Sequence, residues 1–325
     1  MAAVIVILIV VAFLALSEAL LRVFDFAPLR LVPNDKRHNY GHDPELGWIG
    51  IANSVDHVNA SRPITTRHNS LGLRDIEPAH SDGPTILFLG DSFVWGVDVE
   101  AEERFTDRLR SDIPAVRIVN AGIAGYGTDQ EYVLLQRLWP LMKPSVVVLI
   151  FCGNDRDDNK SNYRYYSFKP YLTKVEDRWQ LRGQPVPVAP QLYFYNNWFA
   201  LHFASVRLAF FVYSLVQHIE VSVPDPTDQL ITMMRDFIET RDAKFLIGLE
   251  PNDAALEAFL DTQKIPYTRL DDAERFPEWG CHWTPVGHVL VAERLLTLLS
   301  EEGVVSDGTG QQRTTHFRLS EGDQR

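Results

Sequence analysis

The sequence contains only two cysteines in 325 residues, Cys152 and Cys281. So few cysteines exclude a disulfide-stabilised scaffold, and neither residue belongs to a Cys-x-x-Cys or Cys/His pattern that would bind zinc. The chain also lacks a basic block, and its formal net charge is -12. Because nucleic acid attracts positively charged surfaces, this composition argues against nucleic acid as a partner.

Several familiar catalytic and ligand-binding motifs do not occur in the chain. There is no P-loop or Gly-x-Gly-x-x-Gly for a nucleotide, no His-Glu-x-x-His for a metal, and no Gly-x-Ser-x-Gly elbow of the α/β-hydrolase type. One acidic group, Asp155, Asp157 and Asp158, has no His residues or second carboxylate set at ligand spacing. We therefore expect a solvated loop there rather than a metal site, and we expect no cofactor.

A long run without charge occurs at the N-terminus, where residues 1–17 precede Glu18 and Arg22. This length is near the lower limit for a membrane-spanning helix, and we expect a membrane anchor over residues 1–24. A cleaved signal peptide is less favoured, because the basic n-region and a clean cleavage site are missing, and a buried soluble helix is a third alternative. Positive charges after the segment would leave the main domain in the cytoplasm, although interspersed acidic residues weaken this bias.

Residues 84–303 alternate short apolar runs with amphipathic segments, whereas residues 304–325 form a polar tail that we expect to be disordered. This alternation predicts a parallel sheet with helices on both faces. The predicted strands are 85–89, 116–120, 145–151, 244–250 and 265–270, and the predicted helices are 102–113, 129–142, 252–263 and 285–303.

Two segments do not follow this alternation. Residues 25–83 are rich in Pro, Asn, His and Asp and predict an irregular lead-in. Residues 156–225 form an insertion that begins with a predicted β-hairpin, whose turn is at Glu176-Asp177. A strongly apolar, aromatic helix follows over residues 193–217. We expect this helix to pack on the domain as a cap, and contact with a membrane surface is the less favoured alternative.

Chemically active residue types gather in four short segments that follow predicted strands or precede the last helix. In a parallel sheet such loops converge on one edge, where these folds bind ligands. A serine nucleophile needs a neighbouring base, usually His, and the tetrahedral intermediate needs donors such as backbone N–H groups or an Asn amide. The four segments supply these types and predict a serine acyl-transfer site; they are residues 90–92, 120–127, 153–155 and 281–288.

These four segments, in this order, resemble those of the SGNH (GDSL-type) hydrolases, and the resemblance covers roughly residues 45–303. It includes the lead-in sequences LGWIGIAN and NSLGLRD, which look like those of a bacterial subgroup with an N-terminal membrane anchor. The resemblance implies an α/β fold, a three-layer α/β/α sandwich with a flavodoxin-like parallel sheet, here with the inserted hairpin and aromatic helix. It also implies a catalytic domain outside the cytoplasm, in the periplasm or at the cell surface.

Carried over segment by segment, the resemblance implies a role for each of four residues. Ser92 is the implied nucleophile and its own N–H an oxyanion donor, with Gly125 as a backbone donor and Asn154 as a side-chain donor. His282 is the implied general base, because it precedes His288 by six residues, as the first His does in the family. We expect His288 itself to pack or hydrogen-bond at the start of the last helix.

The sequence departs from the family pattern at the triad acid. The family has Asp two or three residues before the catalytic His, and here Gly280 and Trp279 occupy those positions. Glu278, four residues before His282, is the preferred candidate for the acid. Two alternatives remain, namely a Ser-His dyad oriented by a backbone carbonyl, and a carboxylate from further upstream, Asp271 or Asp272.

A smaller departure concerns the cysteines. Cys152 stands where the family usually has a glycine, two residues before Asn154, and Cys281 directly precedes His282. In an oxidising compartment the two could form a disulfide between these loops. Two free, partly buried thiols are the preferred interpretation.

The resemblance implies an esterase-type hydrolase that acts on an acyl ester, with O-acetyl esters included. An O-acyltransferase that modifies a cell-envelope polysaccharide or lipid is the first alternative. The second is a catalytically impaired, carbohydrate-binding component of an envelope complex. Intact Ser92, Asn154 and His282 argue against this second alternative.

Overall fold

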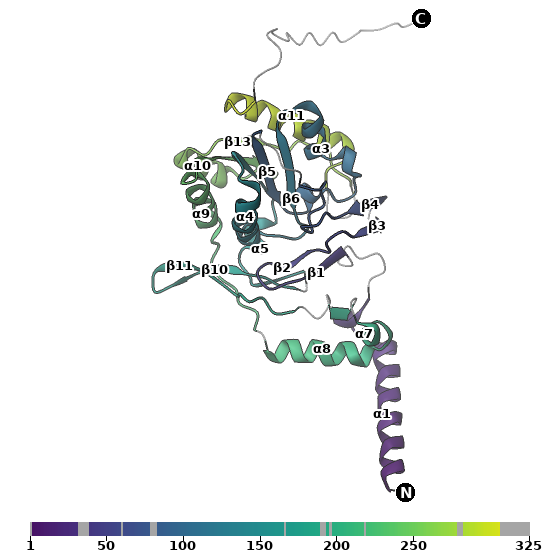
Figure 1. The fold of residues 1–325 in the computed structure, drawn as a ribbon. Coiled ribbons are helices and arrows are strands. Elements are labelled where there is room, and N and C mark those ends of the chain that lie inside the picture. Colours follow the sequence, from purple (N-terminus) through teal and green to yellow (C-terminus); the bar gives the residue numbers. More distant parts are fainter. Residues whose placement is uncertain are drawn as a thin grey trace, which may run out of the picture.

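A parallel five-stranded sheet forms the centre of the protein, in the order β13-β12-β7-β5-β6 (Figure 1). The structure is a computed structural model that describes residues 2–31, 39–59, 61–78, 83–165, 167–188, 193–194, 197–217, 219–277 and 282–305. The strands are β5 (Thr85–Gly90), β6 (Arg117–Gly122), β7 (Val146–Phe151), β12 (Lys244–Leu249) and β13 (Tyr267–Arg269). The predicted α/β class with a parallel sheet is therefore confirmed.

Helices cover both faces of this sheet. Successive side chains of each buried strand point to opposite faces, so each strand packs against helices on both sides. Ile86 and Phe88 of β5 pack in one cluster, and Leu87 and Leu89 pack in the other. The first cluster includes α3 (Phe105–Asp112) and α11 (Pro285–Glu301), and the second includes α4 (Thr128–Met142), α9 (Thr227–Glu239) and α10 (Ala254–Gln263).

Most of these elements begin and end within a few residues of the bounds predicted from the sequence. The last helix begins as predicted, with Thr284 as N-cap accepting a hydrogen bond from Gly287 N at 3.1 Å. Helix α9 is not among the helices predicted from the sequence. Its signal is the apolar spacing of Leu230, Ile231 and Met234, which marks one helix face.

The prediction of an irregular lead-in is wrong, since residues 40–67 form two antiparallel hairpins. Their strands have only four or five residues, too few for a clear alternation, and tertiary contacts stabilise them. Trp48, for example, donates from Nε1 to Ala124 O at 3.1 Å, 76 residues away. The strands are β1 (Tyr40–Asp43), β2 (Gly47–Gly50), β3 (Val55–Asn59) and β4 (Pro63–Arg67).

The inserted hairpin has the predicted strands and turn. β10 (Tyr171–Val175) pairs with β11 (Arg178–Arg182). Glu176 and Asp177 between them have φ angles of 50° and 60°. Positive φ at both central residues is what a two-residue type I′ turn requires.

The aromatic segment differs from its prediction in two ways. It forms two helices, α7 (Trp198–His202) and α8 (Ala204–Gln217), because Phe203 between them is extended, with φ -126° and ψ 118°. It also packs against α1 (Ala2–Phe24) and the short helix η1 (Ala27–Leu29), so it does not cap the domain (Figure 1).

Helix α1 projects from the rest of the protein (Figure 1). Most of its apolar side chains from Val4 to Phe24 are exposed, whereas Leu21 is half-buried against the rest of the protein. Within the described part of the chain it is the one helix long and apolar enough to cross a membrane, a property that signal sequences share.

Short elements complete the fold, namely α2 (Ser92–Trp95), η3 (Ala101–Glu103), α5 (Asp155–Asp158), β8 (Tyr163–Arg164) and β9 (Ser167–Phe168).

Candidate active site

The fold brings Ser92 and His282 together, although 190 residues separate them in the chain. Ser92 is the first residue of α2, directly after β5, and His282 lies three residues before α11. Ser92 Oγ and His282 Nε2 are 2.9 Å apart, at hydrogen-bond distance. The side chains are largely buried, with 8% of Ser92 and 7% of His282 exposed. This is the contact that a serine and its general base require.

The turn that holds Ser92 is closely packed. Asp91 caps α2, since its Oδ1 accepts a hydrogen bond from Phe93 N at 3.0 Å. A Cβ on Gly90 would lie 2.3 Å from Val94 Cγ2 and 3.2 Å from Ile150 O. No side chain fits at that position, so a glycine is required where the strand turns into the helix.

Asp91 also contacts the Ser92 hydroxyl, with 3.3 Å between Asp91 Oδ2 and Ser92 Oγ. A hydroxyl has one hydrogen, so Ser92 cannot donate to Asp91 and to His282 at the same time. Burial raises the pKa of Asp91, which favours its neutral form. A neutral Asp91 can donate to Oγ and leaves the serine hydrogen for His282.

Cys152 is free and buried, and its Sγ donates to Asp91 Oδ1 at 3.0 Å. Burial raises the pKa of the Cys152 thiol, and the neighbouring carboxyl of Asp91 raises it further. The thiol therefore acts as a hydrogen-bond donor at a position where a glycine would offer none. Cys281 lies outside the described residues.

Asn154 lies at the start of α5, directly after β7, beside the Ser92 turn. Its Nδ2 donates to Asp158 Oδ2 at 2.9 Å, and a second hydrogen bond joins its side chain to Asp91. Two carboxyl groups thus fix the orientation of the amide. Its role as an oxyanion donor remains a prediction.

Gly125 lies in the loop between β6 and α4 and has a φ of 81°, in the left-handed region. A Cβ there would lie 3.0 Å from Tyr165 Cδ2 and 3.6 Å from Trp48 Cζ2. The inserted segment and the lead-in therefore close around this turn, and only glycine suits it. The donation of its N–H to an oxyanion remains a prediction.

His288 and Asn120, two other polar residues of the predicted segments, have structural contacts. His288 is buried, stacks on Phe105 and accepts from Phe105 N at 3.3 Å, and burial lowers its pKa to about 3. Asn120 is fully buried and donates from Nδ2 to Val94 O at 2.7 Å. These contacts indicate a structural role for both residues, rather than that of a second base or hydrogen-bond donor for Ser92.

The acidic group of residues 155–158 is not a solvated loop, contrary to the prediction. Helix α5 turns Asp155 and Asp158 inward, where both are fully buried, and leaves Asp157 exposed. Asp158 accepts from Arg164 Nε at 2.6 Å and from Tyr165 Oη at 3.0 Å. The spacing of three residues explains the common inner face, but the sequence alone did not show that the insertion would cover it.

Glu131 of α4 adds to this buried acidic group. Both of its carboxyl oxygens, and Oδ1 of Asp155, have no hydrogen-bond partner within the described ranges. Burial raises the pKa of Glu131 and of Asp155 well above the ordinary value, and each is raised further by the other acids of the group. Both are therefore neutral, since an ionised, unpaired carboxylate would be far too costly at such positions.

One buried ion pair lies beside these acids. Lys169 Nζ contacts Asp129 Oδ2, and both side chains are fully buried. Burial raises the pKa of Asp129 to about 6, although Lys169 opposes the shift. Over the part of the chain that the structure describes, no group of three or more His, Cys, Asp or Glu side chains could hold a metal ion.

Glu250, at the end of β12, is a site residue that the sequence analysis missed. Its Oε2 accepts from Gly153 N at 2.9 Å, and its Oε1 pairs with Arg275. The Arg275 guanidinium lies 5.8 Å from the Phe93 ring centre, and that ring is 5.1 Å from the ring of His282. Glu250 therefore joins the Asn154 loop to the segment before His282. A charged residue directly after the buried run KFLIGL is the signal that could have identified it.

Of the candidates for the triad acid, Glu278 lies outside the described residues. Phe276 N donates to His282 O at 2.8 Å, so the chain on either side of Glu278 is held together. Asp272 is half exposed and pairs with Arg294 at 2.5 Å, on the outside of α11. This surface pairing disfavours Asp272 as the partner of His282.

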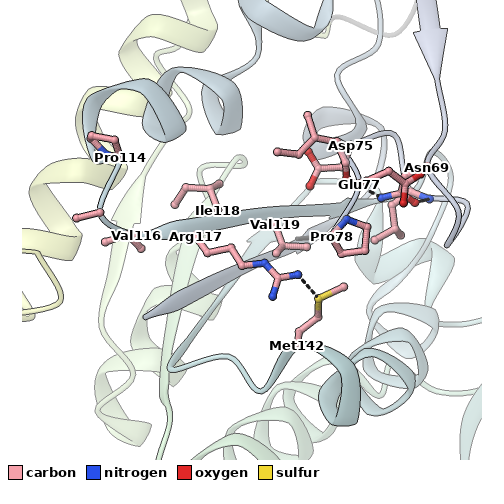
Figure 2. Close-up of a pocket in the computed structure, with 13 residues that line it drawn as sticks. Asn69, Asp75, Glu77, Pro78, Pro114, Val116, Arg117, Ile118, Val119 and Met142 are labelled. Carbon is pink, nitrogen blue, oxygen red and sulfur yellow. Dashed lines mark hydrogen bonds between the residues drawn. The ribbon is translucent and has the colours of Figure 1, made fainter. Parts of the chain in front are cut away.

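A cavity of about 270 Å³ lies away from Ser92, beside the first half of edge strand β6 (Figure 2). Arg117 and Val119 of β6 line it together with Met142, whose Sδ is 3.1 Å from Arg117 Nη2. Asp75 in its wall is occupied, because it pairs with Arg110 at 2.6 Å. The cavity therefore does not mark the candidate site.

Comparison with known proteins gives one family match. The GDSL-like lipase/acylhydrolase family model matches residues 88–210, a segment that contains Ser92, Gly125 and Asn154 but not His282. A search of curated proteins finds no match. The match covers less than half of the 325 residues.

Solved structures with some similarity cover about two thirds of the chain. TesA is 16% identical, with a TM-score of 0.40 over 67% of this chain and 98% of its own. The esterase EstA from Pseudoalteromonas sp. is 11% identical, with a TM-score of 0.40 over 68% and 99%. The lipase/acylhydrolase from Enterococcus faecalis is 14% identical, with a TM-score of 0.39 over 67% and 96%. Similarities this low carry no argument about activity.

We predict that Glu131→Gln flattens the pH dependence of stability. Between the ordinary pKa of 4.5 and the raised value, the unfolded chain has lost the Glu131 proton and the folded chain keeps it. The free energy of unfolding therefore falls by about 1.4 kcal/mol per pH unit as the pH rises through this window. A neutral Gln removes this loss, so the variant should be more stable than the parent at alkaline pH and similar at acidic pH.

Chemical denaturation at about pH 5 and about pH 8 measures this effect. Glu102→Gln, on an exposed residue of η3, is the matched control and should leave the slope unchanged. An equal slope in Glu131→Gln and the parent would show that Glu131 is ionised in the folded state.

Proposed function

We propose that this protein is a serine ester hydrolase of the GDSL type, with Ser92 as nucleophile and His282 as general base. The observation that supports this most is the 2.9 Å contact between Ser92 Oγ and His282 Nε2. The family match ends at residue 210, so it contributes nothing to the placement of His282. The side-chain geometry therefore supports the same serine as the family match, and does so independently of it.

In the proposed reaction His282 Nε2 takes the Ser92 proton while Oγ attacks the ester carbonyl. The N–H groups of Ser92 and Gly125 and the Asn154 amide stabilise the oxyanion. His282 then gives its proton to the departing alcohol, and an acyl-enzyme remains on Ser92. Water, deprotonated by His282, attacks the acyl carbonyl, and the acid leaves as Ser92 regains its hydrogen. No cofactor takes part in these steps.

Glu278 is the proposed partner of His282 on the other side of the imidazole. A carboxylate there would hold the ring in the tautomer whose Nε2 is free to accept from Ser92. A short segment that begins at Phe276 and returns to His282 makes Glu278 the nearest carboxylate along the chain. The dyad oriented by a backbone carbonyl is the alternative.

The proposed substrate is an acyl ester, such as an O-acetyl ester, at the cell envelope. We include anchoring through α1 in this proposal, because α1 exposes most of its apolar side chains from Val4 to Phe24. The placement of the catalytic domain outside the cytoplasm rests on the family resemblance. An acyl-enzyme can also pass its acyl group to a sugar or lipid hydroxyl. Acetate release measured with and without a polysaccharide acceptor separates hydrolase from acyltransferase.

We predict that Ser92→Ala lowers kcat/KM for a p-nitrophenyl acyl ester by roughly 10⁴-fold or more and abolishes labelling by a fluorophosphonate. The alanine leaves no nucleophile for either reaction. Ser111→Ala, which changes an exposed serine of α3, is the control and should keep both signals. Labelling of the Ser92→Ala protein, or no labelling of the folded parent, would contradict the proposed mechanism.

Removing the Asn154 amide should slow the reaction without preventing labelling. We expect Asn154→Ala to lower kcat by about 10²- to 10³-fold, because one oxyanion donor is lost. Asn252→Ala, on an exposed residue, should leave kcat unchanged. A kcat for Asn154→Ala within a few-fold of the parent would show that the amide serves only to hold Asp158 and Asp91.

A panel of carboxylate variants identifies the triad acid. We expect Glu278→Gln to lower kcat by about 10³- to 10⁴-fold, because His282 loses its orientation, with little change in KM. Asp271→Asn and Asp272→Asn are matched changes and should be nearly silent. Near-parental activity in all three variants would support the dyad, and a large loss in either Asp variant would move the role upstream.

A further inference from the structure

An apolar stripe of α8 is exposed in the structure. Val212, Leu215 and Val216 are 48%, 60% and 75% exposed, and Ile219, just beyond the helix, is 80% exposed. Val212, Leu215 and Val216 lie three and four residues apart, which places them along one face of α8. The stripe is therefore continuous, unlike isolated exposed side chains, and such a surface marks an interaction site.

Exposed aromatic residues also occur in α7 and directly after it. Trp198, Phe199 and Phe203 are all exposed. From Trp198 to Ile219 the sequence contains no Asp, Glu or Lys, and Arg207 is its one Arg. Aromatic side chains of this kind concentrate at the boundary between lipid and water.

The α7–α8 segment is attached to α1 by polar contacts from two α1 residues. Glu18 caps the start of α8, since its carboxylate accepts from Ala204 N at 2.9 Å and from Ser205 N at 2.8 Å. Arg22 Nη2 donates to His202 O at 2.7 Å, at the end of α7. The junction of α7 and α8 is thus fixed at the level of Glu18 and Arg22 along α1.

This level is where an interfacial helix should lie if α1 crosses a membrane. Helix α1 continues for six residues beyond Glu18 to Phe24, which is about 9 Å of helix rise. Interfacial helices are buried about 5–10 Å into the boundary between headgroups and acyl chains. Figure 1 shows α8 running across the direction of α1, as a helix in the membrane plane would.

Arginines gather at the same level. A cavity of about 540 Å³ at the junction of α1 and α8 is lined by Arg22, Arg30 and Arg207, together with apolar residues and Asp25. Asp25 pairs with Arg30 at 2.8 Å and Glu18 pairs with Arg22 at 2.7 Å, so three arginines face two carboxylates at this level, in a chain whose net charge is -12. Guanidinium groups bind phosphate oxygens well, and phosphates lie at this depth of a phospholipid layer.

We propose that α7 and α8 lie in the surface of the membrane that α1 crosses, with the apolar stripe among the acyl chains and the cavity arginines against lipid phosphates. This inference rests on the proposed function in one respect, the anchoring through α1. The edge of the sheet at which α5 follows β7 faces the side of the molecule that carries α8 (Figure 1). Ser92 lies at that edge, so the substrate is an ester presented at the membrane surface.

The test uses the full chain in phosphatidylcholine vesicles that contain phosphatidylglycerol, with an environment-sensitive fluorophore on single cysteines. Cys281→Ser removes one native thiol, and the other, Cys152, is buried. The label at Val216→Cys should be shielded from aqueous iodide and quenched several-fold by lipids with a nitroxide near the headgroup. Glu239→Cys, exposed on α9, should show the opposite pattern, and Val10→Cys should respond to deep nitroxides.

The proposal would be overturned if iodide reaches the label at residue 216 while the label at residue 10 lies in lipid. Shielding of residue 216 from both quenchers would also overturn it, because a second copy or another protein would then cover the stripe. Arg30→Glu should reduce the shallow quenching by about half, whereas Arg241→Glu, just beyond α9, should leave it unchanged. No effect of Arg30→Glu would overturn the phosphate contact.

These signals do not depend on catalysis. The Ser92→Ala protein should give the same fluorescence as the parent. The membrane docking and the proposed reaction can therefore each be contradicted without the other. If the parent docks but shows no esterase activity or fluorophosphonate labelling, the proposed function is contradicted and the docking surface stands.

Discussion

The Asp91 carboxyl group connects the two loops from which the candidate site is built. It is buried between β5 and β7, caps the turn of Ser92 through Phe93 N, and accepts a hydrogen bond from Cys152 Sγ. It also contacts the Ser92 hydroxyl and the Asn154 side chain. Because one group joins all these parts, the protonation of Asp91 affects the nucleophile, its turn and the predicted oxyanion donor together. A neutral Asp91 leaves the serine hydrogen to His282, and an ionised one competes for it.

The neighbouring acids show why that neutral form is favoured. Burial raises the pKa of Glu131, Asp155 and Asp91 alike. Asp91 and Asp158 raise the pKa of both Glu131 and Asp155 further, and Asp158 also raises that of Asp91. Lys169 pairs with Asp129, and Arg164 pairs with Asp158. Ionising Glu131 and Asp155 as well would be costly at such short range, which favours their neutral forms. Asp91 and Asp155 accept hydrogen bonds from Phe93 N and Cys152 N, whereas the carboxyl oxygens of Glu131 have no partner within the described ranges.

Segments outside the sheet decide how the site is enclosed and, in our proposal, where it is presented. Trp48 from the lead-in and Tyr165 from the insertion close around Gly125. The rest of the insertion leads to α8, whose first turn is capped by Glu18 of α1. The insertion therefore contributes at one end to the candidate active site and at the other to the proposed membrane surface. It gives a physical reason for an insertion that the central fold does not need.

Short-range patterns in the sequence determined the strands and most helices of the central fold and the hairpin turn at Glu176-Asp177. These features depend on apolar spacing, caps and turn residues within a few positions, which a sequence displays directly. Ser92 and His282 were implied by the resemblance of four short segments to a known family. The tertiary structure alone decided that His282 reaches Ser92, that Asp155 is buried and that Glu250 joins two loops. Each of these depends on segments far apart in the chain, whose packing sets distance, burial and protonation together. The residues next to a side chain in the sequence do not show which distant segment will cover it.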